Sequence, residues 1–284
     1  MEKIISGKVR EVYQVSDDRL AIVTTDRISA FDVILPTPIT DKGKVLNSLS
    51  SFWFDYTKDI VKNHMVSENP ADMPEELRGP EFDGRTILVK KLRMLPFEFI
   101  VRGYLFGSMW KEYQKTGGFC GTKFPEGMQQ AEKLPEPMLT PSTKAEEGHD
   151  VNVSIGYMEE KLGAEMARKV CDTAMALYKR AYDYAYERGI IIADTKFEFG
   201  LDENGELVVA DEVLTPDSSR FWSREKYKVG TSPESFDKQY VRDWLIEKGL
   251  DGRTPPPELP EEVVRRTREK YLECRERLVK QDGK

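Results

Sequence analysis

The feature that most constrains this 284-residue chain is a pair of apolar runs, within residues 194–213, that flank Asn204-Gly205. Asn-Gly between two apolar runs is a strong signal for a β-hairpin. In the first run, the two-residue period of a strand places Asp194, Lys196 and Glu198 on one face. The returning run brings Asp211 close to that face. We therefore expect a sheet that presents carboxylates beside a lysine.

Carboxylates beside a lysine suit a magnesium-bound triphosphate. The acids would hold the metal, and the ammonium group would stabilise a phosphoryl group in transfer. A surface ladder of salt bridges would give the same pattern. We favour the functional interpretation because the polar face continues into residues 217–220, where Asp217 and the anion-binding Arg220 occur.

Two polar clusters near the N-terminus have both a functional and a structural interpretation. The first, Gly7-Lys8-Val9-Arg10, could bring backbone N–H groups and an ammonium group to a phosphate, although no Walker sequence is present. A solvated, basic strand end explains it equally simply. The second, residues 26–32 (DRISAFD), could hold a ligand or form an ordinary charged turn.

Two further clusters lie in the middle of the chain. Arg102 ends an apolar run and needs an anionic partner, either Glu98, an aspartate or a ligand. Ser108 could cap a helix or bind phosphate at the start of that helix. Ser142 and Lys144 belong to a proline-rich segment whose hydroxyl and ammonium groups suit anion capture, unless solvent alone surrounds them.

The remaining pattern predicts an α+β fold with two lobes, at residues 1–93 and 94–284. Turn residues at 16–18 indicate an early hairpin, and residues 86–92 indicate a strand. Helical spacing predicts helices at 45–63, 157–188, 234–248 and 260–280. Three prolines predict that residues 134–150 form a long loop, which we interpret as a lid over a binding site.

Composition limits the partners. The chain has 50 acidic and 43 basic residues and a net charge of −7, which opposes broad nucleic-acid binding. We also expect no membrane partner and a cytoplasmic location, because no apolar stretch is long enough for a membrane span or a signal peptide. Three scattered cysteines and two histidines make a disulfide framework or a zinc site improbable. A homo-oligomer is compatible with the sequence.

Six segments together resemble the SAICAR synthetase family of purine biosynthesis. They are GKVR, DRISAFD, PFEFIVRGYLFGS, PSTKAE, DTKFEFG and DEVLTPDSSRFW, in this order from residue 7 to residue 222. The DTKFEFG and PDSSRFW runs are highly specific together. The resemblance implies an ATP-dependent ligase that joins carboxyaminoimidazole ribonucleotide (CAIR) to L-aspartate and releases ADP and phosphate. It also implies an α+β fold with an ATP-grasp-like cleft between the two lobes.

The resemblance also implies roles for particular residues. Lys8, Arg10 and Lys90 would lie at ATP, and Glu198 and Asp211 would hold Mg²⁺ at that nucleotide. Lys196, Glu198 and Asp211 would be catalytic. The substrate-binding residues would be Arg102, Ser108, Ser142, Lys144, Lys196, Asp217 and Arg220.

Two positions depart from the family pattern, and two other functions compete with the ligase. Phe106 stands where a small residue or threonine is usual, and Val151 where an acid is common. An inositol-phosphate-kinase-like enzyme would also carry Asp-x-Lys on a strand. A nucleotide-binding protein without catalysis would typically have lost Lys196, Glu198 or Asp211, and all three are present.

Overall fold

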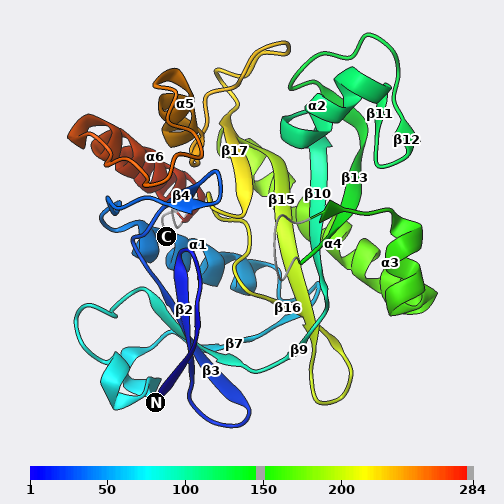
Figure 1. Ribbon diagram of the computed structural model, residues 1–284. Coiled ribbons are helices and arrows are strands. Elements are labelled where there is room, and N and C mark those ends of the chain that lie inside the picture. Colours follow the sequence, from blue (N-terminus) through cyan, green and yellow to red (C-terminus); the bar gives the residue numbers. More distant parts are fainter. Residues whose placement is uncertain (145–150, 280–284) are drawn as a thin grey trace.

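Two large, mainly antiparallel β-sheets form the framework of the protein (Figure 1). The computed structural model describes residues 1–144 and 151–279, so Ala145–Asp150, which belong to the expected loop, lie outside the described part. The chain thus has the mixed α and β character that the sequence predicts.

The outer sheet contains five strands from the first third of the chain. Its order is β1 (Glu2–Ser6), β2 (Arg10–Gln14), β3 (Arg19–Thr24), β8 (Thr86–Lys90) and β7 (Met65–Ser67). The early hairpin is confirmed, since β2 and β3 pair across residues 15–18. Two short 3-10 helices, Pro70–Asp72 and Glu75–Leu77, lie between β7 and β8.

The central sheet has β15 (Ile190–Leu201) in its middle. Its order is β14 (Val151–Asn152), β13 (Lys133–Thr143), β10 (Phe97–Tyr104), β15, β16 (Leu207–Ala210) and β6 (Lys62–Asn63), and β9 (Arg93–Met94) and β17 (Ser219–Ser223) also pair with β15. The hairpin at Asn204-Gly205 is confirmed, because β15 and β16 are antiparallel neighbours. Two small hairpins, β4 (Ser29–Ala30) with β5 (Val33–Ile34) and β11 (Gly118–Phe119) with β12 (Thr122–Lys123), complete the strands.

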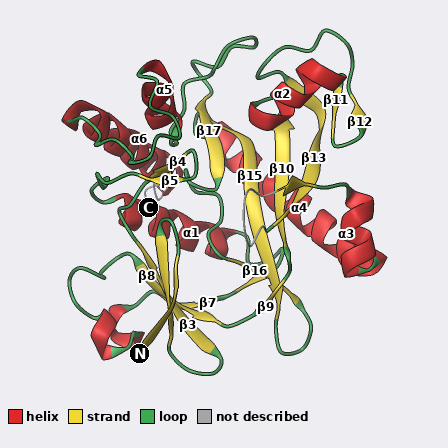
Figure 2. Ribbon diagram, in the orientation of Figure 1, coloured by secondary structure: helices red, strands yellow, loops and turns green. Residues whose placement is uncertain are grey.

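Helices surround the sheets (Figure 2). They are α1 (Lys42–Tyr56), α2 (Gly107–Thr116), α3 (Ile155–Leu162), α4 (Ala164–Glu187), α5 (Gln239–Glu247) and α6 (Glu261–Val279). Helix α4 packs on β15 and β10 because Val170, Ala174 and Leu177 recur on one face and are fully buried there. None of the described helices is long and apolar enough to cross a membrane.

Several expectations from the sequence need correction. The helix expected at 45–63 ends at Tyr56, and the helix expected at 234–248 begins at Gln239. Residues 133–143 form an 11-residue strand rather than a loop, so the lid interpretation fails for this part. The expected helix at 157–188 is two helices, because Gly163 between them has φ 82° and ψ 146°, a conformation outside the helix.

The two sheets meet at His64. This residue stands between β6 of the central sheet and β7 of the outer sheet. Its backbone N–H donates to Val209 at 3.1 Å, and its carbonyl accepts from Lys90 at 2.8 Å. The imidazole is buried edge-on against Phe54. One residue therefore connects the hydrogen-bond ladders of both sheets.

The ends of the chain also return to one another. Ile28, Ala30, Leu35 and Ile39 around the β4–β5 hairpin share an apolar cluster with Val241 and Leu245 of α5 and Val263 of α6. The C-terminal helices thus pack on the N-terminal part of the chain, across the expected boundary at residue 93.

Candidate active site

A cleft of about 990 Å³ opens between the outer sheet, the β4–β5 hairpin, the start of α2, strand β15 and helix α5. Among the described residues, seven cationic and five anionic side chains line it. The cations are Lys8, Arg10, Lys111, Lys196, Arg220, Lys238 and Arg242. A chain with a net charge of −7 thus has an excess of positive charge in this cleft, which favours anionic ligands.

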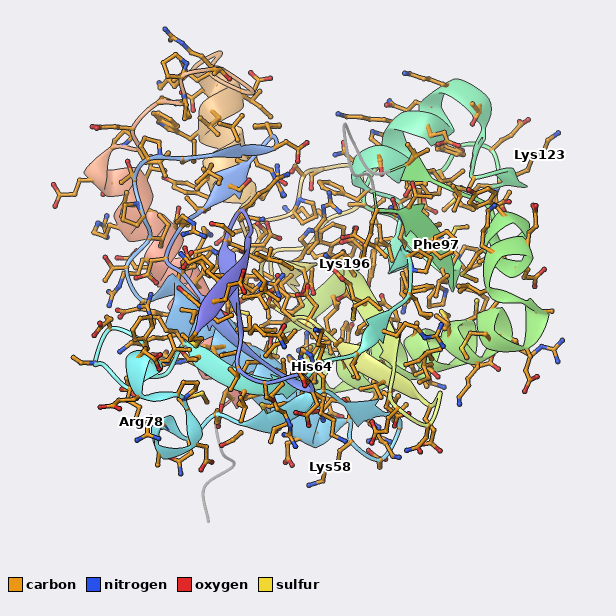
Figure 3. The ribbon with its side chains drawn as sticks, turned by 60° about the horizontal axis from the view of Figure 1, so that its bottom comes forward. Lys58, His64, Arg78, Phe97, Lys123 and Lys196 are labelled. Carbon is orange, nitrogen blue, oxygen red and sulfur yellow. The ribbon has the colours of Figure 1, made fainter. Side chains whose placement is uncertain are left out.

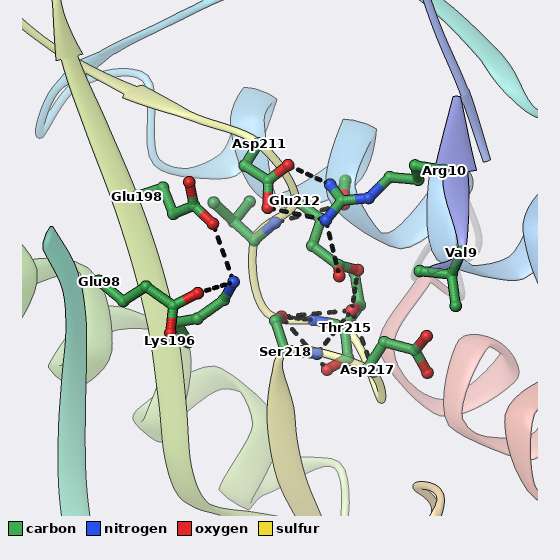
Figure 4. A network of polar contacts seen from close by, with 12 residues as sticks. Val9, Arg10, Glu98, Lys196, Glu198, Asp211, Glu212, Thr215, Asp217 and Ser218 are labelled. Carbon is green, nitrogen blue, oxygen red and sulfur yellow. Dashed lines mark hydrogen bonds and ion pairs between the residues drawn. The ribbon is translucent and has the colours of Figure 1, made fainter. Parts of the chain in front are cut away.

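Lys196 is the centre of a carboxylate cluster (Figure 4). Its Nζ donates to Glu98 Oε1 at 2.7 Å and to Glu198 Oε1 at 2.8 Å. Burial lowers the pKa of this ammonium group, but the neighbouring carboxylates of Glu198, Asp211 and Glu98 outweigh burial and raise the pKa. Lys196 is therefore held as a cation, and Figure 3 shows it near the middle of the molecule, whereas Lys123 lies at the edge.

Asp211 and Arg10 form an ion pair between the end of β16 and the start of β2. Asp211 has φ 63°, a left-handed conformation that aspartate tolerates better than most residues. Arg10 Nη2 donates to Asp211 Oδ2 at 2.8 Å and lies 3.4 Å from Glu212 Oε1. Burial raises the pKa of Asp211, but the neighbouring cations Arg10 and Lys196 outweigh burial and lower the pKa. The carboxylate is therefore ionised.

Arg220 faces the start of α2. Its Nη1 donates to Asp194 Oδ2 at 2.5 Å, which raises the arginine pKa. The guanidinium group can lie there because Gly107 has no side chain: a Cβ atom at Gly107 would be 2.8 Å from Arg220 Nη2. Exposed Ser108 follows in the first turn of α2, so an arginine, a hydroxyl group and a helix N-terminus line the same part of the cleft, an arrangement that suits a phosphate.

Asp217 is held by two buried partners. Lys42 Nζ donates to Asp217 Oδ2 at 2.7 Å, and Tyr271 of α6 donates its hydroxyl hydrogen to Asp217 Oδ1 at 2.7 Å. The side chains of Lys42 and Asp217 are each at most 1% exposed. Burial raises the pKa of Asp217, but Lys238 and Lys42 outweigh it and lower the pKa. Asp217 is thus a fixed anion in the wall of the cleft.

Lys144 also reaches the cluster, although the residues before it form a strand and not the expected loop. It directly follows strand β13, which ends at Thr143, and forms an ion pair with Glu198. Glu198 is therefore shared by Lys144 and Lys196. Ser142, in the same strand, is buried beside Glu98 in the β10–β13 register.

Arg102 and Lys90 lie outside the residues that line the cleft. Arg102 is 4% exposed, and its Nε donates to Thr140 Oγ1 at 2.9 Å. Its Nη1 is 3.9 Å from Asp194, and burial lowers its pKa despite this neighbour. Lys90 is exposed at the end of β8 in the outer sheet. Their assignment to substrates and ATP stays a prediction.

A family model described as SAICAR synthetase matches residues 3–257. The chain belongs to the SAICAR synthetase family. It is 55% identical over 276 residues to the phosphoribosylaminoimidazole-succinocarboxamide synthase of Maridesulfovibrio salexigens, a match covering 96% of this chain and 92% of the relative. It is 52% identical over 280 residues to the enzyme of that name from Chromobacterium violaceum, with 98% and 99% covered.

Solved structures agree. A SAICAR synthase from Saccharomyces cerevisiae complexed with SAICAR has 45% identity and a TM-score of 0.91, with 99% of this chain and 96% of that chain covered. A SAICAR synthetase (Type-2) in complex with ADP has 25% identity and a TM-score of 0.72, with 99% of both chains covered. The resemblance read from the sequence motifs is confirmed.

Within this SAICAR synthetase fold, the structure brings most of the predicted site residues to one place. Seven of them line the cleft: Lys8, Arg10, Ser108, Lys196, Asp211, Asp217 and Arg220. Glu198 and Lys144 join them through Lys196 and each other.

Sequence reasoning missed Lys238 and Arg242. Both line the cleft at the start of α5, four residues apart and therefore on one helix face. Burial lowers the pKa of Lys238 more than Asp217 raises it, so this ammonium group would gain from an anionic ligand. The spacing of four residues between Lys238 and Arg242, within the helix expected at 234–248, was the sequence signal that could have indicated this cationic helix face.

The two residues that depart from the family pattern lie in different surroundings, one beside the cleft and one at the edge of a sheet. Phe106 is buried, packs edge-on against Trp222 and lies below the Arg220 guanidinium group. It supports this arginine and lines the cleft beside it. Val151 is 59% exposed at the edge of the central sheet.

The donors for a metal are carboxylates. Within residues 1–144 and 151–279, no group of three or more acidic, histidine or cysteine side chains forms a ready metal site. Mg²⁺ usually takes one or two carboxylates and completes its shell with phosphate oxygens and water. Glu198 pairs with Ala210, the residue before Asp211, so both carboxylates lie at this end of the β15–β16 pair and fit this requirement together with a triphosphate.

Proposed function

We propose that three groups of cations in the central cleft each hold one anionic substrate of the SAICAR synthetase reaction. This member of the family joins CAIR and L-aspartate in purine biosynthesis and uses ATP as a co-substrate. The observation that carries the assignment is the origin of these cations in three separate elements around Lys196: the β1–β2 turn, strand β17 and helix α5.

The ATP phosphates are assigned to the outer sheet. Lys8 and Arg10 flank Val9 at the turn between β1 and β2, where the backbone of Gly7 also faces the cleft. Lys90 would contact the nucleotide farther along this sheet. In this proposal residues 1–93 act as the ATP lobe and residues 94–284 as the substrate lobe, with an ATP-grasp-like cleft between them.

The CAIR phosphate is assigned to the start of α2. Arg220 offers a planar fork, Ser108 a hydroxyl group and α2 its free N–H groups. Arg102 lies behind Asp194 with its pKa lowered by burial, so an added anion would compensate its charge. Ser142 and Lys144 would contribute from the side of β13, next to Glu98 and Glu198.

The aspartate carboxylates are assigned to Lys238 and Arg242 of α5. Both cations lie on the wall opposite the central sheet, near Asp217 and the β4–β5 hairpin. Aspartate has two carboxylates, and one helix face with two cations matches this charge. Asp217 is ionised and would attract the ammonium group of aspartate.

The reaction requires activation of the CAIR carboxylate. Direct amide formation would expel oxide, whereas transfer of the γ-phosphoryl group first makes an acyl phosphate with phosphate as its leaving group. Lys196 would stabilise negative charge on the phosphoryl group in transfer, because Glu98 and Glu198 fix its position before substrates bind. Mg²⁺, when held by Glu198 and Asp211, would neutralise phosphate charge there.

Measurement of ADP release, with each substrate omitted in turn, tests this function. ADP should form with ATP, CAIR and aspartate together, and SAICAR should accumulate with it. Release of ADP that depends on a polyol or sugar phosphate instead would favour the small-molecule kinase. ATP binding without turnover under any combination would favour a protein that only binds nucleotides.

A further inference from the structure

The turn between β4 and β5 places an aromatic residue in an unusual backbone conformation. Ser29 pairs with Ile34 and Ala30 with Val33, which leaves Phe31 and Asp32 as the two turn residues. Their φ angles are 51° and 63°. Turns with two positive φ values strongly favour asparagine, aspartate and glycine, and phenylalanine is unfavourable there. Such strain at a site edge points to a functional reason for the side chain.

The ring of Phe31 is directed to the cleft rather than to the hairpin core. Ala30 packs in the small cluster with Val241 and Leu245, whereas Phe31 lines the cleft and is 38% exposed. Lys8 forms an ion pair with Asp32, which ties this turn to the turn that carries the phosphate-binding cations.

A second exposed apolar side chain lies on the same wall. Ile246 of α5 lines the cleft and is 55% exposed. It follows Leu245, which packs against the β4–β5 hairpin, and it is one helical turn beyond Arg242. Phe31 and Ile246 thus line the same cleft as Lys238 and Arg242, the cations assigned to aspartate.

We propose that Phe31 and Ile246 form an apolar cover that keeps water from the activated CAIR carboxylate until the aspartate amine attacks. This inference rests on the function proposed above. When the amine attacks, a C–N bond forms, the bond from carbon to the phosphate oxygen breaks, and the amine loses a proton. When water attacks the same carbon, CAIR is regenerated and phosphate is released, so ATP is hydrolysed to ADP and phosphate without formation of SAICAR. Exclusion of water from reactive intermediates is a recognised function of closed active sites.

The test compares ADP formed with SAICAR formed under saturating ATP, CAIR and aspartate. The wild-type ratio should be close to one. Phe31→Asn removes the ring but keeps a residue that tolerates positive φ, and the ratio should rise at least about twofold. Phe31→Tyr keeps the ring and should retain the wild-type ratio. Ile246→Ser should raise the ratio in the same direction.

Ile34→Ala is the matched control, because Ile34 lies on the same hairpin and is 41% exposed but does not line the described cleft. Its ratio should stay at the wild-type value. A folded Phe31→Asn variant that keeps a ratio close to one overturns the proposal, even if its KM for aspartate rises. Absence of SAICAR formation by the wild-type protein would overturn the proposed function itself, and with it this inference.

Discussion

The two sheets contribute to the cleft in opposite ways. Strand β1 of the outer sheet is exposed along its whole length, and β2 is half-buried. Strand β15 of the central sheet is buried except at Lys196 and Glu198, which are partly exposed. The outer sheet therefore presents its cations on a turn near solvent, whereas the central sheet presents Lys196 from a rigid core.

This difference shows how one cleft can combine adaptability with fixed geometry. Arg10 is held mainly by charge pairing with Asp211 across the cleft, so its position depends on both sheets. Lys196 is held by Glu98 on the adjacent strand β10 and by Glu198 on its own strand. Substitutions in the central sheet should consequently affect catalysis most, and those near the outer surface least.

The largest effect is expected for the carboxylates at the β15–β16 hairpin. Glu198→Gln and Asp211→Asn should each lower kcat by about 10²–10³, because loss of such a preorganised charge commonly has this effect. Circular dichroism should show an intact fold. Glu203→Gln, an exposed substitution in the turn of the same hairpin, is the control. Near wild-type kcat in both site variants at saturating Mg²⁺ would refute the metal assignment.

Next in size is the effect of the arginine at the start of α2. Arg220→Ala should weaken CAIR binding by about 1.5–3 kcal/mol, since a charge-assisted contact is lost, with ATP affinity little changed. Isothermal titration with each ligand separately measures this. Arg224→Ala, four residues along the chain and exposed, should leave both affinities unchanged. Equal losses for ATP and CAIR would place Arg220 in another subsite.

Arg102→Ala should differ from Arg220→Ala. We expect weaker CAIR binding here too, but also a lower melting temperature, because Arg102 is buried with Thr140 and above the Phe119 ring. Thermal denaturation without ligands separates the two arginines. An unchanged melting temperature would show that burial of Arg102 adds nothing to stability.

The junction of the sheets should make stability depend on pH. Burial lowers the pKa of His64 to about 4 from 6.5. Between these values the unfolded chain binds more protons at this residue than the folded one. The titration of His64 should thus leave the free energy of unfolding unchanged above about pH 6.5. As the pH drops from there toward 4, this free energy should fall by up to about 1.4 kcal/mol per pH unit.

Urea denaturation across this range measures the His64 contribution. His64→Gln removes the titrating group, so its unfolding free energy should vary less with pH than that of the wild type. Parallel pH profiles for the two proteins would show that His64 does not titrate on unfolding.

The smallest effect is expected at the end of β13. Lys144→Ala should lower kcat several-fold, because Glu198 loses one of its two cationic partners. The melting temperature should stay unchanged, since a partly exposed ion pair adds little stability. Lys123→Ala, in the exposed β12 strand, serves as the control. An unaltered kcat would show that Lys144 is a solvent-exposed side chain without a role in catalysis.

The sequence predicted those parts of the molecule whose local pattern decides their structure. Asn204-Gly205 specified its hairpin through turn chemistry, and buried apolar spacing specified most of α4. Strand β13 was missed because Pro135, Pro137 and Pro141 indicated a loop. Prolines at alternate positions share one edge of a strand, and among the described strands β14 pairs with β13 only at Ser142 and Thr143. Their missing N–H groups are tolerated at such an edge.

The same limit applies to the cleft. Motifs identified the residues of β15, β16 and β17, which adjoin in the chain or through a short hairpin. Lys42, Lys238 and Tyr271 are brought to Asp217 from α1, α5 and α6 by packing of the whole chain. No local pattern encodes a contact such as that between Lys42 and Asp217, which lie 175 positions apart in the chain.

The ion pairs inside the cleft have a consequence for competition among anions. Arg10, Lys196 and Arg220 already have carboxylate counter-ions before any ligand enters. A small inorganic anion would have to compete with a tethered carboxylate for a single cation, so its net binding free energy is small. A substrate that engages several cations at once, or brings its own divalent metal, gains enough to replace these internal partners. The free enzyme is thereby screened against the phosphate and chloride that surround it.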